Sequence, residues 1–340
     1  MTTIPILSVR NLTAEFQLAN KKNARAIENI SFDVMPGQTI GLVGESGCGK
    51  TTTLMSIMRL LPANGRILAG NAYFKGNDLF AISEQEMRDH RWKDLAIIFQ
   101  GAMNALNPVM KIGNQIREAI LLHNLMDREK ADARVDELLE LVGIPRLRRD
   151  QYPHQYSGGM RQRAMIAMAL ACSPELLFAD EPTTALDVMI QAQVLELLKQ
   201  IQIKLGLAIV LVTHDLGVIA EMCDEVVVMY GGMIAEYGDT ELVYNQPQHP
   251  YTQRLLESFP DLSSPGNYSA GQDLMTIPGT PPSLSDLPAG CRFNPRCHKT
   301  IEICKRMIPN SVDMSAPGSQ KKHYATCHLL NRDELKAYDQ

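Results

Sequence analysis

The sequence predicts an α/β fold with a mostly helical insertion and a loop-rich tail that carries cysteines. Short apolar runs alternate with helical patterns on either side of the insertion, which is typical of a parallel sheet covered by helices. Strand patterns vanish between residues 112 and 171, and the composition changes after about Gln246. These observations, together with the length of 340 residues, predict one large α/β domain with an appendage.

Individual elements follow from apolar periodicity and turn residues. The expected strands are residues 6–16, 30–34, 39–43, 95–99, 176–179 and 208–212. The expected helices are residues 51–61, 132–142, 158–171, 188–203 and 216–222. Pro36-Gly37 is a turn pair, so the second and third strands are predicted to form a hairpin. Residues 259–290 are rich in Pro, Gly, Ser and Asp, which indicates a loop or linker.

The composition argues against several function classes. The net charge is −5, whereas nucleic-acid binders usually carry a basic surface. The longest apolar run, residues 205–212, is far shorter than the ~20 residues that span a bilayer, and the N-terminal residues show no secretory signal. Any membrane role is therefore expected to come from partner chains. The seven cysteines, an odd number, predict a reducing cytoplasm and free thiols or metal ligands.

Residues 44–51 form a phosphate-binding pattern. They are Gly44, Glu45, Ser46, Gly47, Cys48, Gly49, Lys50 and Thr51, which fit G-x4-G-K-[ST]. The glycines let backbone N–H groups turn toward phosphate oxygens, and the next helix begins there with its positive dipole end. Lys50 is expected to reach the β- and γ-phosphates, and the Thr51 hydroxyl to bind Mg²⁺. The alternative is a glycine-rich turn that fits the pattern by chance.

Two carboxylates follow an apolar strand at residues 176–179. Asp180 is expected to hold Mg²⁺ through the metal's water shell, because Mg²⁺ loses its water reluctantly. Glu181 is expected to accept a proton from the attacking water. The alternative for Glu181 is a helix cap, since Pro182 suits a first helical position.

A third motif begins at Ser157. Ser157 is a good helix N-cap, and Gly158 and Gly159 allow the backbone to approach an anion closely. On its own, this motif is equally well explained as a capped helix start.

Residues 1–245 resemble the nucleotide-binding subunit of ABC transporters, and six motifs occur in that family's order. They are the Walker A loop at 44–51, the Q-loop Gln100, the signature at 156–163, the Walker B residues Asp180 and Glu181, the D-loop at 185–187 and the switch residue His214. The resemblance implies an ABC-type P-loop ATPase with a mixed-sheet core and a helical subdomain at about 104–172. It also implies ATP and Mg²⁺ as the nucleotide and its metal.

The resemblance further implies that two such domains close face to face, with ATP between one chain's Walker A loop and the other's signature. Catalysis is expected from Glu181, His214, Lys50 and Gln100. Mg²⁺ is expected to bind Thr51, Gln100 and Asp180. The expected nucleotide contacts are Phe16, which would stack on adenine, then residues 44–51, Thr52, Gln100, Asp180, Ser157, Gly158 and Gly159. For His214 the alternative is a helix-capping or core histidine.

The sequence departs from the family pattern at two places. The first signature position, usually Leu, is Tyr156. Gln100 is followed by Gly101-Ala102, where relatives usually carry Glu-Pro. In relatives this stretch faces the membrane partner, so the departure concerns coupling rather than hydrolysis.

Residues 246–340 resemble the tail of the oligopeptide, dipeptide and nickel importer branch of ABC ATPases. The likeness rests on His249-Pro250-Tyr251-Thr252, Arg254-Leu255-Leu256, Ile277-Pro278-Gly279 and Gly290-Cys291. It implies peptide as the transported substrate, with nickel or a metal chelate as the alternative. A soluble ABC ATPase without a transport role is disfavoured, because the chain holds one cassette and no long coiled coil.

Four cysteines cluster in this tail: Cys291, Cys297, Cys304 and Cys327. Thiolates so close in sequence are expected to share a metal. The resemblance implies a [4Fe–4S] cluster, with Zn²⁺ and free or disulfide-paired thiols as alternatives. Three nearby histidines, His298, His323 and His328, could replace a cysteine as ligands.

The branch also implies partners. They are two transmembrane permease subunits, a second and different ABC ATPase subunit, and an extracytoplasmic solute-binding protein, with no nucleic acid. The chain is then expected at the cytoplasmic face of the plasma (inner) membrane, bound peripherally.

Overall fold

The computed structural model describes residues 4–19, 22–101, 105–184, 186–258, 277–331 and 335. Within it the chain folds into two compact units. Unit 1 comprises Met1–Ser8, Asp33–Thr39 and Ala72–Val212, and unit 2 comprises Val9–Phe32, Ile40–Asn71 and Thr213–Gln340. Predictions that concern Ala102, Ala185 and residues 259–276 lie outside the described residues.

Three parallel strands form the centre of unit 1. β7 (Leu176–Asp180) pairs on one side with β6 (Leu95–Ile98) and on the other with β8 (Ala208–Val212). Every residue of β7 and β8 is buried, as expected for parallel strands that are covered on both faces. α6 (Val188–Leu205) connects β7 to β8 and buries one stripe of its surface, including Val194 and Leu198. The predicted parallel arrangement is confirmed in this unit.

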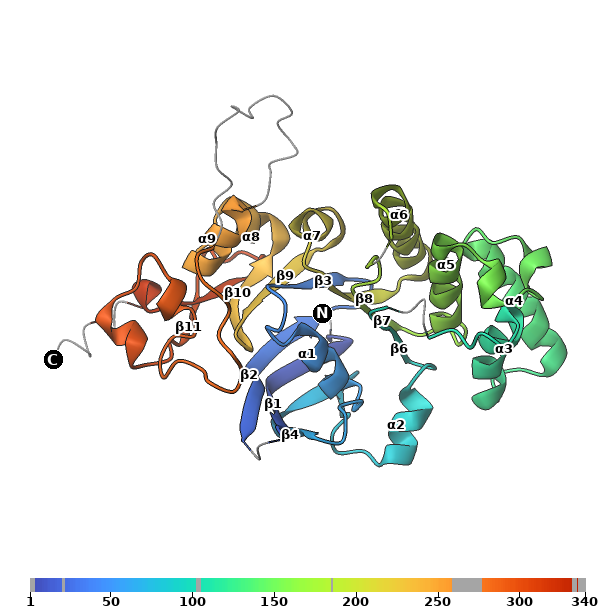
Figure 1. Cartoon of the computed structure of the whole chain (residues 1–340), viewed down its shortest axis with the longest axis horizontal. Helices are drawn as coiled ribbons and strands as arrows, with labels where there is room; N and C mark the ends of the chain where they lie inside the picture. Colours follow the sequence, from blue (N-terminus) through green and yellow to red (C-terminus); the bar gives the residue numbers. More distant parts are fainter. Residues whose placement is uncertain are drawn as a thin grey trace, which may run out of the picture. The chain divides into compact units, whose positions relative to one another are not determined.

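The insertion of unit 1 is helical, as predicted, and its main helices are α3 (Ile112–Leu122), α4 (Arg128–Leu141) and α5 (Gly158–Ala169) (Figure 1). Two 3₁₀ turns, Arg146–Arg148 and Pro153–Gln155, separate α4 from α5. α3 was not predicted as a separate helix, and its N-cap Lys111 provides no capping hydrogen bond. α2 (Glu84–His90) was not predicted either, although Ser83 and Glu86 form a capping box at its start.

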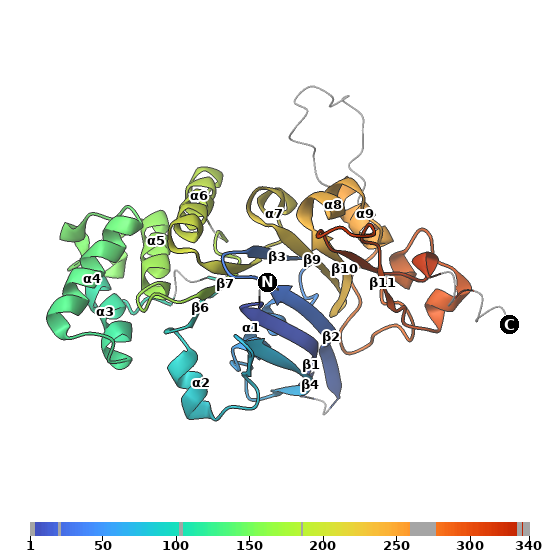
Figure 2. The same ribbon diagram turned by 180° about the vertical axis from the view of Figure 1, so that it is seen from behind.

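The N-terminal strands form a separate sheet in the order β2 (Asn23–Val34), β1 (Leu7–Gln17), β4 (Gly65–Phe74) (Figure 2). The short β5 (Asn77–Asp78) pairs with the end of β4. The predicted hairpin was wrong, because β2 lies in this sheet whereas β3 (Thr39–Val43) pairs in parallel with β9 (Glu225–Tyr230). β3 is buried along its whole length, so it requires cover on both faces, which a two-stranded hairpin does not provide.

In unit 2, the pair of β3 and β9 is extended by β10 (Met233–Asp239) and by two strands from the tail. β9 pairs antiparallel with β10, which pairs antiparallel with β12 (His323–Thr326). β11 (Ser311–Asp313) pairs with β12. Parallel and antiparallel pairs thus occur together, which confirms the mixed sheet. The tail strands are three and four residues long, too short to give a clear alternating pattern.

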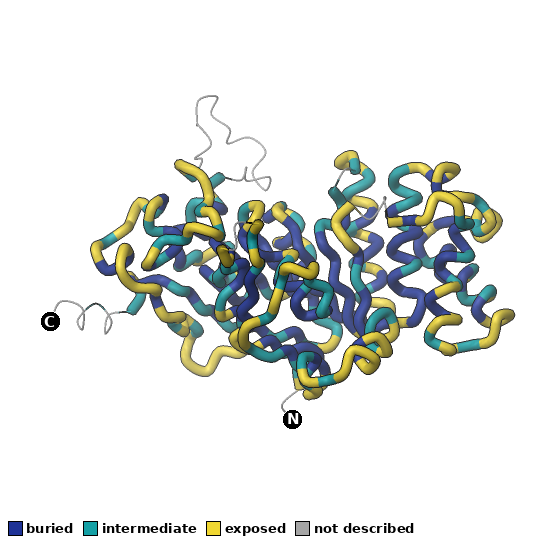
Figure 3. The backbone as a smooth tube through the Cα atoms, turned by 60° about the horizontal axis from the view of Figure 1, so that its bottom comes forward, coloured by how far each residue is buried: buried dark blue, intermediate teal, exposed yellow. Residues whose placement is uncertain are grey.

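The helices of unit 2 are short: α1 (Lys50–Ile57), α7 (Leu216–Met222), α8 (Thr240–Asn245) and α9 (Pro250–Glu257). The remaining tail contains 3₁₀ turns at Asn294–Arg296, Glu302–Lys305 and His328–Leu330. α1 ends four residues before the predicted end, because Arg59 adopts a left-handed backbone with φ 52°. In both units buried residues follow the strands and the inner faces of the helices (Figure 3).

Candidate functional site

The phosphate loop of unit 2 joins β3 directly to α1. Gly44, Gly47 and Gly49 have φ of 150°, 79° and 105°, which side-chain-bearing residues rarely adopt. A Cβ at Gly49 would lie 2.6 Å from the Ile27 side chain, so the close packing of the loop also requires glycine there. Gly49 is the N-cap of α1, and the first helical residue is Lys50. The predicted loop-to-helix arrangement is therefore present.

Lys50 folds back into this loop. Its buried ammonium donates to the carbonyl oxygens of Gly44 at 2.6 Å and Glu45 at 3.1 Å. The Cys48 thiol lies 3.7 Å from the same ammonium, and burial raises the pKa of this thiol. Lys50 is thus the positive charge at the centre of the loop. In the first turn of α1, Thr51 is exposed and Thr52 is half-buried.

The carboxylates of unit 1 lie where β7 ends. Asp180 is the buried last residue of the strand, and Glu181 follows with a left-handed φ of 45°. One Glu181 oxygen accepts hydrogen bonds from the Gln100 amide at 2.7 Å and from the Thr184 hydroxyl at 2.9 Å. The structure therefore brings together Gln100 and Glu181, two predicted site residues that are 81 positions apart. A non-glycine residue with positive φ at this point is typical of functional sites.

His214 follows β8 and is exposed, so the alternative of a core histidine was wrong. The backbone N–H of its neighbour Thr213 donates to Leu42 of β3. Asp215 is the residue that caps α7, accepting hydrogen bonds from Gly217 at 2.8 Å and Val218 at 3.3 Å. The residue that caps α7 is therefore Asp215, the neighbour of His214, and not His214 itself.

The signature begins α5 in unit 1. The exposed Ser157 is its N-cap, and its hydroxyl accepts a hydrogen bond from the N–H of Met160 at 3.3 Å. Gly158 and Gly159 form the first helical turn. Tyr156, the departure from the family pattern, is buried and donates to the carbonyl of Arg148 at 3.0 Å. Burial raises the pKa of the Tyr156 hydroxyl to about 12, so this residue is a neutral packing group.

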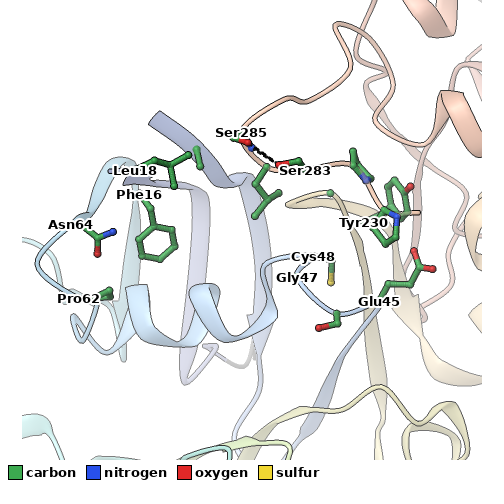
Figure 4. Close-up of a pocket in the computed structure, with 16 residues that line it drawn as sticks. Phe16, Leu18, Glu45, Gly47, Cys48, Pro62, Asn64, Tyr230, Ser283 and Ser285 are labelled. Carbon is green, nitrogen blue, oxygen red and sulfur yellow. Dashed lines mark hydrogen bonds between the residues drawn. The ribbon is translucent and has the colours of Figure 1, made fainter. Parts of the chain in front are cut away.

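A pocket of about 770 Å³ lies beside the phosphate loop within unit 2 (Figure 4). Its volume is that of a typical small-molecule site. The residues that line it come from β1, β2, the phosphate loop, the segment before β4, the end of β9 and the tail. They are Phe16, Leu18, Ala24, Glu45, Ser46, Gly47, Cys48, Pro62, Asn64, Tyr230, Gly231, Pro281, Pro282, Ser283, Leu284 and Ser285. Phe16 and the loop were predicted. The tail residues were missed, because nothing in their sequence indicates contact with a loop more than 230 positions away.

The tail holds the phosphate loop at Glu45. Arg296 donates to both oxygens of this carboxylate, at 2.6 and 3.0 Å, and to the Tyr230 hydroxyl at 3.1 Å. Burial favours the neutral form of Arg296, but the hydrogen bonds to Glu45 and Tyr230 outweigh it and raise the pKa of the guanidinium. The backbone N–H of Glu45 donates to the Tyr251 hydroxyl at 3.0 Å.

The four tail cysteines influence one another electrostatically. Burial raises the pKa of Cys291 to about 12 and that of Cys327 to about 11, and the neighbouring cysteines add to both shifts. Nevertheless, within the part of the chain that the structure describes, no group of three or more His, Cys, Asp or Glu side chains is arranged to hold a metal ion. Cysteine side chains are suitable metal ligands, but the four tail cysteines are not arranged around a common point that could hold a metal ion.

The nearby histidines have other partners. Nε2 of His323 lies 2.7 Å from the buried Glu236 carboxylate, and Nε2 of His328 lies 2.9 Å from the carbonyl of Met307. Nδ1 of His298 lies 3.4 Å from the guanidinium of Arg254. Separately, none of the described helices has the length and apolar character that crossing a membrane requires.

Comparisons with known proteins agree with this architecture. Residues 27–184 match the ABC transporter family, and residues 235–304 match the oligopeptide/dipeptide transporter C-terminal region. A dimeric bacterial ABC transporter cassette, MJ0796, superposes with a TM-score of 0.61 at 25% identity, covering 69% of this chain and 98% of that one. The cbiO1 structure from Clostridium perfringens gives 0.61 at 26% identity, covering 71% and 91%. The fold and the site thus define an ATP-binding cassette ATPase.

Relatives of known description identify the branch. The dipeptide transport ATP-binding protein DppD of Bacillus subtilis is 48% identical over 332 residues, which cover 96% of this chain and 95% of that protein. The oligopeptide transport ATP-binding protein OppD of Salmonella typhimurium is 44% identical over 315 residues, which cover 92% and 91%. The chain belongs to the ATP-binding subunits of ABC transporters, in the branch that carries the oligopeptide/dipeptide C-terminal region.

Proposed function

We propose that this chain hydrolyses ATP to drive uptake of peptides through a membrane importer. The observation that carries the proposal is the combination of a complete set of nucleotide-site motifs with a tail of the oligopeptide/dipeptide type. The relatives DppD and OppD, described as dipeptide and oligopeptide transport ATP-binding proteins, support peptide as the cargo.

Uptake by cells tests the cargo. A strain without this gene should lose accumulation of labelled di- and oligopeptides, and the wild-type gene should restore it while Glu181→Gln should not. Uptake of a free amino acid is the control. If peptide uptake is unchanged and nickel uptake is lost instead, the cargo is a metal or its chelate.

In the proposed chemistry, ATP phosphates bind the N–H groups of the loop and the ammonium of Lys50. Bound Mg²⁺, held by Thr51, Asp180 and Gln100, would supply charge neutralisation at the phosphates. Glu181 accepts the proton of the attacking water, and its hydrogen bond to Gln100 orients the carboxylate. His214, exposed at the end of β8, contacts the γ-phosphate.

The second half of the site comes from another cassette. Ser157, Gly158 and Gly159 are exposed or half-buried residues at the start of α5, and a helix N-terminus suits an anion. Ser157 of this chain would then complete the site of its partner. That MJ0796 forms a dimer supports such a pairing.

The proposed assembly contains two permease subunits, a second and different ATPase and an extracytoplasmic binding protein. In it, residues 1–245 form the cassette, 104–172 its helical subdomain and 246–340 the extension. The chain would bind peripherally at the cytoplasmic face of the membrane. Co-purification from the native host tests this set, and recovery of the chain with only a second copy of itself would contradict the heterodimer.

The four tail cysteines are proposed to hold a [4Fe–4S] cluster that stabilises the tail. Their number and their closeness in sequence support this, and metal binding would require the thiols to move together. Anaerobic purification should give a coloured protein with iron and acid-labile sulfide, and Cys297→Ser should lose both. Cys172→Ser, outside the tail, is the matched control. A colourless protein that contains zinc would replace the cluster with a zinc site.

A further inference from the structure

The pocket beside the phosphate loop has two walls that come from distant parts of the chain (Figure 4). Phe16 and Leu18, at and just beyond the end of β1, provide one wall. The Phe16 ring lies against Gly65, where a Cβ would be 2.8 Å from Cε1 of the ring. The backbone of β4 therefore supports this ring at the edge of the pocket.

Residues 281–285 of the tail provide the other wall. Pro282 and Leu284 are half-buried in this segment. Its shape is set locally, because the N–H of Asp286 donates to the carbonyl of Ser283 at 2.9 Å, and the hydroxyls of Ser283 and Ser285 lie 2.7 Å apart. The segment thus presents an ordered turn with apolar side chains to the pocket.

One side chain connects this wall to the phosphate loop. The guanidinium of Arg296 donates to the carbonyls of Pro278 at 2.8 Å and Ile277 at 3.2 Å, just before the wall begins. The same guanidinium donates twice to Glu45 of the loop. Arg296 is itself buried, with 6% of its side chain exposed, so these bonds are protected from water. Tail and loop are therefore held together by a bidentate, charge-assisted contact.

We propose that residues 281–285 form the outer wall of the subsite for the base and ribose of the nucleotide, and that Arg296 is the positioning residue that holds this wall on the phosphate loop. The inference rests on the proposed function, which places the phosphates at the loop. A flat base that extends from the loop toward Phe16 would then lie between an aromatic ring and the apolar side chains of the tail. The tail would contribute affinity for nucleosides but none for bare phosphate.

The comparison of ATP with inorganic triphosphate isolates this contribution, because both carry the phosphate chain and only ATP carries a nucleoside. In the full-length chain, Leu284→Ser should weaken ATP binding about tenfold, as expected for the loss of one apolar contact surface. The affinity for Mg²⁺-triphosphate should not change. Leu287→Ser is the matched control, since Leu287 is also half-buried but does not line the pocket.

The outcomes separate this inference from the proposed function. A wild-type chain that does not bind ATP contradicts the proposed function itself. A wild-type chain that binds ATP, with Leu284→Ser unchanged or with ATP and triphosphate weakened equally, contradicts only the tail wall.

Photolabelling of the wild-type chain tests the wall even if the Leu284 variant does not fold. 8-Azido-ATP carries its reactive group on the base, so label should appear in the tryptic peptide of residues 255–292, which contains the wall. Excess ATP should prevent the labelling and excess triphosphate should reduce it too, since both occupy the loop. Label confined to peptides outside residues 255–292 would overturn the proposal.

Arg296→Lys tests the positioning role. Lysine keeps the positive charge but cannot form the paired hydrogen bonds to Glu45 and to the two carbonyls. The ratio of ATP affinity to triphosphate affinity should fall several-fold, to an extent similar to that of Leu284→Ser. A structural role alone would change the thermal stability and leave this ratio as in the wild type.

Discussion

Two glutamates of the nucleotide-site motifs, Glu181 and Glu45, have different hydrogen-bond donors around them. Glu181, after β7 in unit 1, accepts hydrogen bonds from an amide and a hydroxyl, Gln100 and Thr184, both uncharged. Glu45, in the phosphate loop of unit 2, accepts two hydrogen bonds from the guanidinium of Arg296. Hydrogen bonds from neutral donors orient the first carboxylate. The second carboxylate forms an ion pair with a buried guanidinium.

This difference indicates the task of each residue. A carboxylate that is oriented by hydrogen bonds at the end of a strand is suited to accept a proton from water. A carboxylate paired with a buried guanidinium is bound in place, and removing it would leave that guanidinium without its counter-charge. We therefore expect Glu181 to contribute to chemistry and Glu45 to the attachment of the tail.

Glu181→Gln is expected to have the largest effect, because it removes the proton acceptor while keeping the shape of the side chain. ATP turnover of the assembled transporter should fall about 10²–10⁴-fold, the usual contribution of a general base. ATP binding, measured by titration, should remain. Glu196→Gln on the exposed face of α6 is the matched control. Turnover at the wild-type rate would remove Glu181 from the role of base.

Lys50→Ala should have the next largest effect. It removes the ammonium that Gly44 and Glu45 hold at the centre of the loop, and hydrogen bonds to charged groups contribute about 1.5–3 kcal/mol. ATP affinity should fall about 10–100-fold, and turnover should fall with it. Equilibrium titration with ATP and with triphosphate measures the loss. Because Lys50 is expected to bind phosphate, both ligands should weaken alike, and a loss confined to ATP would contradict that assignment.

Glu45→Gln is expected mainly to lower the stability of the fold, whereas Glu181→Gln is expected mainly to lower turnover. It leaves the buried Arg296 without its counter-charge, so the free energy of unfolding should fall by about 1–3 kcal/mol. Glu181→Gln should change the stability much less, because its hydrogen bonds to Gln100 and Thr184 come from neutral donors. Urea unfolding of the two variants side by side gives the comparison. If both variants lose the same free energy of unfolding, the ion pair with Arg296 does not make Glu45 more important for stability than Glu181.

The motifs of the site could be predicted from sequence because each is local. The glycines of the loop, Ser157 as an N-cap and the buried strand before Asp180 all follow from backbone conformation and hydrophobic pattern over a few residues. Gln100 was assigned to the site only through the family resemblance. Its contact with Glu181 was not predicted, since no local rule connects positions so far apart.

The tail contacts were missed for the same physical reason. Arg296 stands between two cysteines in a loop-like segment, and only tertiary structure brings it to Glu45. The false hairpin at Pro36-Gly37 shows the reverse error, in which a genuine turn was taken as evidence for pairing. All five residues of β3 are buried, and the strand pairs with β9 instead of β2. A short run of this kind is typical of a central, buried strand.

The stability of the tail is also expected to depend on pH, through a buried histidine. His249 is buried two residues before Tyr251, whose hydroxyl accepts the N–H of Glu45. Burial lowers the pKa of His249 from 6.5 to about 4. The unfolded chain therefore binds a proton more readily than the folded chain. The contribution of His249 is fully present above pH 6.5 and is lost as the pH falls toward 4, with a total of up to about 3 kcal/mol.

His249→Asn separates this titration from the other acid-sensitive groups. Nδ1 of His249 accepts the N–H of Tyr251 at the start of α9, and asparagine is a favoured residue at that capping position. The variant should keep the cap but lose the titratable ring. Between pH 6.5 and 4.5 its unfolding free energy should therefore decline less steeply than that of the wild type. Parallel declines in urea unfolding at each pH would show that His249 does not govern the acid sensitivity of the tail.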